Sequence, residues 1–566
     1  MAFDLDDVKT VVTKKRVPKK LSPTLEVMFP DQQLPSPTMN SVNTVGLPKI
    51  LKALYAGSPE NPLPKKLSKD SWDELRYAFR FPKENVEQIK KALSANLTKG
   101  QKAAFYYMAD FVLDQSSHRF FSLQGYAGTG KSYIVRRLVM FCDLMGVNWL
   151  LTAPTNKATK ELTYSIPGVD KNKCKTIYSA LKLTMSTDED QHVLVDVSKD
   201  DYNSLDIRSG SLLCIDETSM LNSMVTNKVK QCAIDLNLRV LLIGDPDQLR
   251  PVGEERSTAW DLSIIENRID TAHKDIVRHV KLLEVKRFDN ALLDLSVRLR
   301  ECVKNRRLPK GGTKELFKPV AGELFVHDSS AAFEFSILKH KTPDDFKDCR
   351  VIAWRNRAVE RYNELIRQNL GFKEEFNIGD LLLLAQPKLQ RVNYRKSNII
   401  ANIDEEVVVQ AIAQKQMQPT SVYFPHLPRI DFWELTTQTT NFQEKPLQLV
   451  LNMPIAEDHG LEDALQQMAA AAKRVKQQSY KETDRSKSKI LRDEASSRWK
   501  EYWNLREEFT LVRFAYAITA HRAQGSSISR VYVDVRDILA NQDPDEKHQC
   551  LYVGCTRVRQ ELEVLI

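Results

Sequence analysis

The sequence contains no apolar run that approaches the roughly 18 to 20 residues that a membrane-spanning helix needs. Its beginning, MAFDLDDVKT, also lacks the apolar stretch of a secretory signal. Paired cysteines are missing too, because the eight cysteines are scattered, with no C-x-x-C pair and no paired histidines beside them. We therefore expect no membrane partner, a cytoplasmic location, and buried free thiols in place of a disulfide framework or a structural zinc.

The bulk composition favours a large globular protein. Of its 566 residues, 42% are hydrophobic and 28% are charged, which is ordinary for this class. A single core does not grow to this size, so several domains are expected. The net charge of +9 and the pI of about 8.9 suit a polyanionic partner. Because this excess is mild, charge alone leaves the partner open.

The character of the sequence changes along the chain. Residues 1–95 combine Pro, Lys and Ser with few periodic apolar positions, which predicts a partly extended N-terminal extension. From Leu97 onward, short apolar runs alternate with helical patterns, as in α/β proteins with parallel strands. A second alternating region begins near Val351 and resumes at residues 515–535. We therefore expect a second α/β domain that is interrupted by an insertion.

The insertion has two parts of different composition. Residues 378–434 are rich in Val, Ile, Leu, Tyr and Phe and contain Gly and Pro turns, which predicts a small β-barrel. Residues 461–508 are rich in Ala, Gln, Lys, Glu and Arg and have almost no helix breakers. This second part is predicted to form exposed helices.

The strongest signal is the pattern G-x-x-x-x-G-K-S, which follows a predicted strand at residues 118–123 and precedes a predicted helix at residues 132–145. Its glycines let backbone N–H groups converge on phosphate oxygens at the positive end of that helix. Lys131 is expected to meet the β- and γ-phosphates of ATP, and the Ser132 hydroxyl to bind Mg²⁺. The expected ATP-binding residues of this loop are Gly125, Tyr126, Ala127, Gly128, Thr129, Gly130, Lys131 and Ser132.

Polar residues follow two further predicted strands. Asp216 and Glu217 follow the apolar run 212–215, where Asp216 would hold Mg²⁺ and Glu217 would orient and activate the attacking water. Gln248 follows the run 240–243 and could hydrogen-bond the γ-phosphate, although an ordinary Asp-Pro turn also explains this segment. Functional loops follow the carboxyl ends of strands in such sheets, so these residues are expected to face one nucleotide.

In their order along the chain, these segments resemble motifs I, II and III of the superfamily 1 helicases of the Dda, RecD and Pif type, which move 5′ to 3′. The remaining matches are Leu97–Gln101 for the adenine-reading glutamine motif, Thr152–Ala158 for motif Ia, Thr176–Ser179 for motif Ib, Leu283–Arg287 for motif IV, Ala517–Ser526 for motif V and Leu551–Arg557 for motif VI. The resemblance spans about residues 97–566 and leaves the N-terminal extension uncovered.

The resemblance assigns catalytic roles and implies ATP and Mg²⁺ as cofactors. Arg287 and Arg557 would reach the γ-phosphate as arginine fingers, because a guanidinium stabilises charge on the transferred phosphoryl group. Gln101 would read the adenine, although a Gln near a helix start can also be a cap. The implied catalytic set is Lys131, Asp216, Glu217, Gln248, Arg287 and Arg557.

The resemblance also implies a groove for a single strand. Pro154, Thr155 and Asn156 of motif Ia and Thr519 and His521 of motif V would line it. These side chains would contact phosphates and not base edges, so binding would be indifferent to sequence.

Two segments depart from the family pattern. Tyr178 stands where motif Ib would carry His, and its ring would stack on a base. Residues 184–201 alternate enough for a hairpin, which in Dda-like enzymes is the wedge at the fork, although an exposed surface hairpin explains the pattern equally well. No aromatic residue stands at the expected tip, where Val193, Leu194 and Val195 lie.

The fold implied by the resemblance is α/β, with two RecA-like P-loop NTPase domains, an inserted β-hairpin, an SH3-like β-barrel and a helical tower. The implied segments are 96–283 for the first domain with its hairpin at 182–205, 284–375 and 510–566 for the second domain, and 376–509 for the barrel and tower.

The implied function is that of an ATP-dependent DNA helicase or translocase on single-stranded DNA, which unwinds duplexes and displaces bound proteins in replication, recombination or repair. Its implied partners are single-stranded DNA, forked or tailed duplex DNA, and a single-strand-binding, replication or recombination protein. If the chain is of phage origin, its location would be the host cytoplasm. Two alternatives stay open: an RNA helicase, because no quoted residue reads a 2′-hydroxyl, and an ATPase that remodels protein complexes without unwinding.

Overall fold

The computed structural model describes residues 86–114, 118–165, 171–188, 191–195, 207–251, 253–269, 277–284, 291–393, 396–401, 403–440 and 446–566. Most of the N-terminal extension and Arg287 therefore lie outside the described residues. No helix within them combines the length and the apolar character needed to cross a membrane. All eight cysteines are buried free thiols, as predicted.

Six parallel strands form the sheet of the first α/β domain, in the order β3-β2-β6-β7-β1-β8. They are β1 (Phe120–Gly125), β2 (Trp149–Ala153), β3 (Cys174–Thr176), β6 (Leu212–Ile215), β7 (Arg239–Gly244) and β8 (His279–Leu282). The helices are α3 (Val86–Leu93), α4 (Lys99–Leu113), α5 (Lys131–Met145), α6 (Asn156–Ser165), α7 (Ile177–Ala180), α8 (Ser223–Asp235) and α9 (Ala259–Ile269). The strands and the helix predicted around the glycine-rich loop are all present.

Helices cover both faces of this sheet, which explains why β1, β2, β6 and β7 are buried along nearly their whole length. On β1, Phe121 and Leu123 pack in the core on the side of α4 and α5, whereas Phe120 belongs to the core around α8 and α9. Successive side chains of a strand point to opposite faces, so one short apolar run serves two cores. Because the strands are parallel, the loops that follow β1, β6 and β7 lie at one edge of the sheet.

The second α/β domain is a five-stranded parallel sheet in the order β18-β10-β19-β20-β9. Its strands are β9 (Leu324–His327), β10 (Cys349–Ala353), β18 (Ala517–Thr519), β19 (Ile528–Asp534) and β20 (Val558–Leu565). Its helices are α10 (Ala291–Asn305), α11 (Gly312–Leu316), α12 (Ser330–Ile337), α13 (Asn356–Asn369), α16 (Ala520–Ala523), α17 (Val535–Leu539) and α18 (Pro544–Thr556). Strands from before and after the insertion thus share one sheet and one core.

The insertion contains an antiparallel sheet in the order β16-β15-β14-β11-β17 and a two-stranded ribbon. The elements are β11 (Leu381–Leu384), β12 (Lys388–Asn393), β13 (Lys396–Ala401), β14 (Glu406–Met417), β15 (Ile430–Thr439), β16 (Gln448–Pro454), β17 (Val512–Phe514), α14 (Gly460–Lys481) and α15 (Arg485–Glu508). Because β17 pairs with β11, the chain leaves the insertion after residue 514, and the predicted boundary at residue 509 is too early.

A short hairpin follows α7 in the first domain, as the sequence indicated. Its strands are β4 (Thr184–Asp188) and β5 (Gln191–Val195), which pair antiparallel with Asp188 opposite Gln191. Val193, Leu194 and Val195 therefore belong to the strand, and their expected place at the tip is wrong. The turn itself lies outside the described residues.

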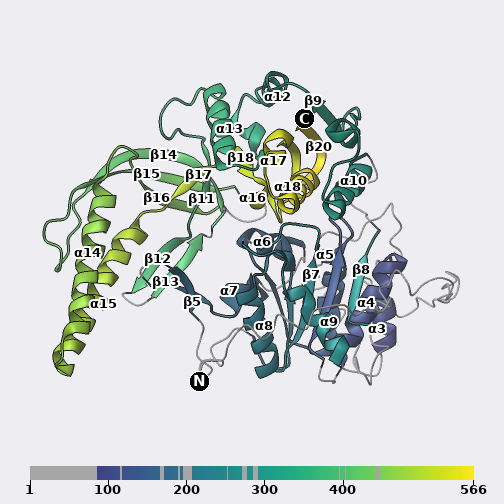
Figure 1. Cartoon of the computed structure of the whole chain (residues 1–566), viewed down its shortest axis with the longest axis horizontal. Helices are drawn as coiled ribbons and strands as arrows, with labels where there is room; N and C mark the ends of the chain where they lie inside the picture. The colour runs from purple at the N-terminus through teal and green to yellow at the C-terminus, as the bar shows by residue number, and fades with distance from the viewer. Residues whose placement is uncertain are drawn as a thin grey trace, which may run out of the picture.

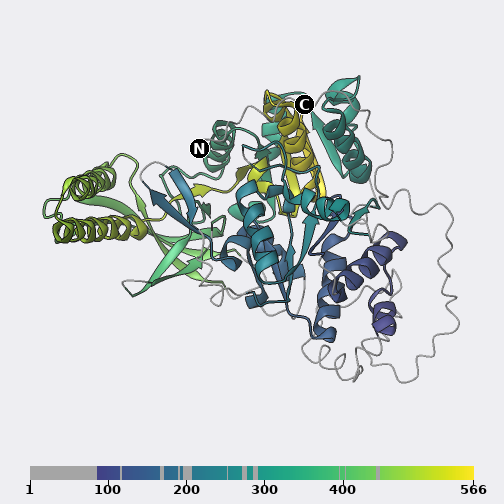
Figure 2. The same ribbon diagram turned by 60° about the horizontal axis from the view of Figure 1, so that its bottom comes forward.

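The three parts meet around α16. In Figure 1 the second α/β domain lies above the first, the insertion lies to their left, and α16 stands near the junction. The long helix pair α14 and α15 projects away from both parallel sheets, and it keeps this outlying position in Figure 2. The first and second domains therefore face each other directly, while the insertion approaches both from one side.

Candidate active site

The glycine-rich loop joins the end of β1 to the start of α5, as predicted. Gly128 and Gly130 have φ angles of +81° and +83°, a region that side chains disfavour. A Cβ on Gly130 would lie 2.5 Å from the Nε2 atom of Gln101, and one on Gly125 would lie 2.6 Å from Thr129 Oγ1. The loop is therefore closed to larger residues, and it leaves the N–H groups at the start of α5 available for an anion.

Lys131 is the first residue of α5, and its side chain folds back over the loop. Its Nζ atom donates hydrogen bonds to the carbonyl oxygens of Gly125 at 2.6 Å and Tyr126 at 3.0 Å. Both contacts hold the ammonium group at the mouth of the loop. Ser132 follows in the first helical turn and is partly exposed.

Gln101 supports the loop from the neighbouring helix α4. Its Nε2 atom donates to the carbonyl of Thr129 at 3.0 Å, and its Oε1 atom accepts from the Thr98 N–H at 3.2 Å. The Thr98 side chain completes a capping box at the start of α4. The alternative interpretation of Gln101 as a helix cap is thus confirmed, and both ends of its amide are engaged.

Two carboxylates follow β6 beside this loop. The Glu217 N–H donates to Asp216 Oδ1 at 2.9 Å, and Glu217 has a φ angle of +50°, which is uncommon for a residue with a side chain. Burial raises the pKa of Asp216 to about 7; the nearby Glu217 also raises it, and Lys131 acts to lower it. The pair therefore holds negative charge next to the lysine of the loop.

A side chain from the second domain enters this group. Gln524 follows α16, and its Nε2 atom lies 3.3 Å from Glu217 Oε2 and 3.4 Å from Gln248 Oε1. It also lies 3.4 Å from Ser219 Oγ. The Gln524 side chain is 4% exposed, and its Oε1 atom has no hydrogen-bond partner among the described residues. One amide thus connects the residues that follow β6 with those that follow β7.

A second contact between the domains comes from α18. The Tyr552 hydroxyl donates to Asp245 Oδ2 at 2.7 Å and accepts from the Ala127 N–H at 3.3 Å. Arg300 of α10 lies over the ring of Tyr126, with 3.8 Å between its guanidinium carbon and the ring centroid. The glycine-rich loop is therefore in direct contact with the second domain.

Of the two arginines expected to reach the γ-phosphate, Arg557 is among the described residues and Arg287 is not. Arg557 is 4% exposed and directly follows α18, where its Nε donates to the Val553 carbonyl at 3.2 Å and its Nη2 to Thr556 Oγ1 at 3.3 Å. It is held inside the second domain, five positions after Tyr552. Arg287 lies outside the described residues.

On the side of the second domain, the contacts described above come from Gln524, Tyr552 and Arg300, to which the sequence assigned no role. Gln524 and Tyr552 lie within the segments matched to motifs V and VI, so the motif match located their segments without assigning them a role. Arg300 lies in a helix that carried no motif. If every polar residue inside a matched motif had been treated as a candidate site residue, Gln524 and Tyr552 would have been included.

Comparisons with known proteins fit this arrangement. Residues 96–303 match the family described as AAA domain, and residues 514–565 match the UvrD-like helicase C-terminal domain. The chain is 26% identical over 475 residues to the ATP-dependent DNA helicase dda of Enterobacteria phage T4, covering 82% of this chain and 98% of the relative. Along most of its length the chain is therefore similar to superfamily 1 helicases, and like them it is an ATP-hydrolysing enzyme of the helicase type.

Two further relatives are more distant or match a smaller part. The ATP-dependent RecD2 DNA helicase of Deinococcus radiodurans is 31% identical over 144 residues, covering 25% of this chain and 18% of the relative. The crystal structure of Pif1 helicase from Candida albicans is 15% identical with a TM-score of 0.44, covering 83% of this helicase and 94% of that chain.

The expected strand contacts of this helicase lie at the starts of two helices. Thr155 Oγ1 accepts from the Ala158 N–H at 3.2 Å, just after Pro154 at the start of α6. Asn156, the first residue of α6, lines a cavity of about 250 Å³. Thr519 lines a second cavity of about 540 Å³. One residue of each predicted group, Asn156 of motif Ia and Thr519 of motif V, therefore borders a cavity.

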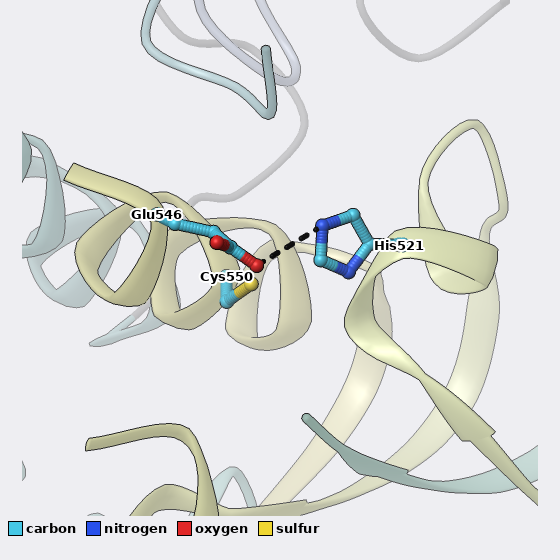
Figure 3. A group of neighbouring side chains, drawn as sticks. All are labelled: His521, Glu546 and Cys550. Carbon is cyan, nitrogen blue, oxygen red and sulfur yellow. Dashed lines mark ion pairs between the residues drawn. The ribbon is translucent and has the colours of Figure 1, made fainter. Parts of the chain in front are cut away.

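His521 of α16 faces α18 of the same domain. Its Nε2 atom lies 3.5 Å from Glu546 Oε1, and Cys550 is their neighbour, as Figure 3 shows. Burial lowers the pKa of His521, and Glu546 acts to raise it. Because this pKa lies below the ordinary value, the imidazole is neutral at neutral pH, and its contact with Glu546 places α16 beside α18 while the histidine side chain stays 37% exposed.

The ring of Tyr178 has a structural role in this helicase. It packs against the core formed around α8 and α9, and burial raises the pKa of its hydroxyl. The residue stays partly exposed, so the stacking on a base expected from its place in motif Ib remains a prediction.

Proposed function

We propose that this helicase is a 5′ to 3′ translocase on single-stranded DNA, which couples ATP hydrolysis to duplex unwinding and to displacement of bound proteins. The observation that carries this proposal is the contact of Gln524 and Tyr552, both from the second domain, with Glu217 and the glycine-rich loop of the first. Residues from both domains thus share one nucleotide cleft. Binding and loss of a γ-phosphate in such a cleft can change the spacing of the two domains, and a strand held by both would be moved.

Within the cleft, each residue has a distinct task. Lys131 exchanges its bonds to loop carbonyls for bonds to the β- and γ-phosphates. Glu217 orients and activates the attacking water, and Gln248 senses the γ-phosphate through the same amide network. Arg287 stabilises the charge that develops on the phosphoryl group, and Arg557 does so after it leaves its present bonds to Val553 and Thr556. Gln101 reads the adenine only after it gives up one of its two present partners.

Mg²⁺ fits the residues of this cleft. The Ser132 hydroxyl and the Asp216 carboxylate offer the hard oxygen ligands that this ion prefers. Glu217 adds a second carboxylate beside Asp216. Lys131 is the one cation that acts to lower the pKa of Asp216, so the described residues of the cleft carry more carboxylates than cations at this point. The ion would supply charge neutralisation on the β- and γ-phosphates.

The architecture proposed for this function has four parts. The two parallel sheets and their helices are RecA-like motor domains, covering about 96–283 and 284–375 with 515–566. The antiparallel sheet of the insertion is an SH3-like barrel, and α14 with α15 is a helical tower. The hairpin β4–β5 is the wedge at the fork. Strand contacts come from the starts of α6 and α16 and are independent of base sequence.

Unwinding of tailed duplexes tests the proposal most directly. Three substrates with the same duplex are compared, carrying a 5′ tail, a 3′ tail or no tail, with ATP and Mg²⁺ present. Unwinding is expected from the 5′ tail alone. Unwinding from the 3′ tail alone would contradict the polarity. ATP hydrolysis that single-stranded DNA stimulates without any unwinding would favour protein remodelling instead.

An RNA strand of the same length and sequence separates the remaining alternative. We expect DNA to stimulate ATP hydrolysis more strongly than RNA, and the opposite ranking would indicate an RNA helicase. Displacement of a single-strand-binding protein from a labelled oligonucleotide tests the proposed action on bound proteins. Both assays use the full chain.

A further inference from the structure

One segment of the insertion carries three consecutive carboxylates against the two motor domains. In this acidic loop, residues 403–406, Asp404 forms an ion pair with Arg522 of α16 in the second domain. Glu405 forms an ion pair with Lys160 of α6 in the first domain. The loop therefore connects all three parts of the molecule through charge.

The third carboxylate of the acidic loop extends this contact. Glu406 Oε2 accepts from Arg350 of β10 at 2.6 Å. Burial acts to raise the pKa of Glu406, but Arg350 and Lys157 outweigh it, and the pKa lies below its ordinary value. The cations around the loop thus favour an anion at this place.

The pairs are partly withdrawn from water. The side chain of Glu405 is 9% exposed and that of Lys160 is 33% exposed. Desolvation offsets much of the attraction in such pairs, so their net contribution to stability is small. Another anion that reaches the same cations can therefore replace a carboxylate at little cost.

The Asp404–Arg522 pair lies between the two cavities that hold the expected strand contacts. Asp404 lines the cavity of about 250 Å³ together with Asn156. Arg522 lines the cavity of about 540 Å³ together with Thr519. Because this pair joins a wall residue of one cavity to a wall residue of the other, a strand that contacted both Asn156 and Thr519 would run beside it.

We propose that Lys160 and Arg522 form a phosphodiester-binding site on the path of the strand, and that Asp404 and Glu405 fill this site until a nucleic-acid phosphate displaces them. Guanidinium and ammonium groups bind phosphate oxygens as they bind carboxylate oxygens, with the guanidinium able to donate two parallel hydrogen bonds. Asn156 on the wall of the same cavity adds a neutral donor. This inference rests on the proposed function, because it describes how the single-stranded DNA of that function would be bound.

Removal of the carboxylate charges tests the proposal. The double variant Asp404→Asn/Glu405→Gln keeps the side-chain shapes and is compared with Glu434→Gln, which loses an ion pair to Lys415 in the same antiparallel sheet and lines neither cavity. Binding of a fluorescent oligo-dT without nucleotide is measured over a range of salt concentrations. The double variant is expected to bind about 10-fold more tightly at low salt.

The salt dependence gives a second readout. Each freed cation adds one phosphate contact, so the slope of log affinity against log salt should become more negative by about 0.7 per contact, or about 1.4 for the double variant. Lys160→Gln and Arg522→Gln should weaken binding and flatten the slope. A double variant that binds no more tightly than the wild type and Glu434→Gln would overturn the proposal.

Hydrogen exchange on the wild-type protein keeps the test independent of variant folding. Addition of oligo-dT should speed exchange in peptides that span residues 403–406 and slow it in those that contain α6 and α16. Unchanged or slower exchange in the acidic loop would overturn the proposal. If the wild type neither binds oligo-dT nor hydrolyses ATP faster with it, the proposed function fails; if it does both and the double variant gains nothing, only the acidic-loop proposal fails.

Discussion

The second α/β domain touches its neighbours in two chemically different ways. In the nucleotide cleft the hydrogen-bond donors that it directs at the carboxylates are neutral, the amide of Gln524 and the hydroxyl of Tyr552, both almost fully buried, while Arg300 lies over the ring of Tyr126. At the acidic loop it offers the cations Arg350 and Arg522 to carboxylates. Buried hydrogen bonds from neutral donors depend on geometry, whereas partly exposed ion pairs weaken with salt, and their cations accept other anions.

The cleft contacts therefore depend on exact placement of their donors, whereas the partners at the acidic loop can be exchanged. In the cleft a misplaced donor leaves a buried polar atom without a partner, which costs free energy and leaves a reacting group badly oriented. At the loop a lost partner can be replaced by solvent or by phosphate. We therefore expect substitutions in the cleft to affect turnover, and substitutions at the loop to affect affinity.

The largest effect is expected from Lys131→Ala. Without the ammonium group that now lies on the loop carbonyls, ATP turnover with saturating single-stranded DNA should fall at least about 100-fold. Turnover is measured by phosphate release. Lys230→Ala, an exposed position on α8, is the matched control. Normal turnover by the Lys131 variant would remove the basis for the phosphate-loop assignment.

Gln524→Ala should show whether the neutral contact controls chemistry. It removes the donor to Glu217 and Gln248, so DNA-stimulated kcat should fall about 10- to 100-fold while the affinity for oligo-dT changes less than about 2-fold. Gln542→Ala, on an exposed turn of the same domain, is the control. Equal losses in kcat and DNA affinity would mean that the cleft and the loop do not differ as described.

Tyr552→Phe isolates one hydroxyl of the cleft. Asp245 and the Ala127 N–H would each lose a buried partner, so the free energy of unfolding should fall by about 1 to 3 kcal/mol. Chemical denaturation measures it. Tyr480→Phe, at a residue that is 73% exposed, should change stability very little. A stable Tyr552 variant would show that the domains do not rely on this bond.

Asp216→Asn sharpens the comparison through pH, because Asp216 lies beside Glu217, the partner of Gln524, and titrates near neutral pH. Its folded pKa of about 7 lies above the ordinary value, so the native state keeps a proton that the unfolded chain loses, and wild-type stability falls as pH rises from about 4 to 7. The variant should lack this fall and gain on the order of 2 kcal/mol at pH 8 without nucleotide. Equal pH profiles would contradict the shift.

The sequence predicted those parts of the fold and of the site that depend on short-range patterns of neighbouring residues. The glycine-rich loop, the strands before Asp216 and Gln248, and the hairpin all follow from patterns within about twenty neighbouring residues. The bond between Ala127 and Tyr552 joins residues 425 positions apart, and no local pattern encodes such a meeting. Arg300 was missed for the same reason, since a basic residue on a helix looks like a solvated face until its partner is known.

The insertion boundary and the acidic loop show a related limit. A three-residue strand such as β17 carries too little pattern to reveal which sheet it joins. The run Asp404-Glu405-Glu406 reads as a polar turn until the cations from two other domains are placed around it.

The four-residue helix α16 is short enough to act as a rigid lever. Arg522, inside it, reaches toward the acidic loop, and Gln524, directly after it, reaches the carboxylate that would activate water. The helix is only about 6 Å long at 1.5 Å per residue. A single turn of backbone would then connect ATP hydrolysis to movement of the bound strand, without a longer chain of intervening contacts. A residue inserted between Arg522 and Gln524 should uncouple the two processes while leaving the contacts at each end intact.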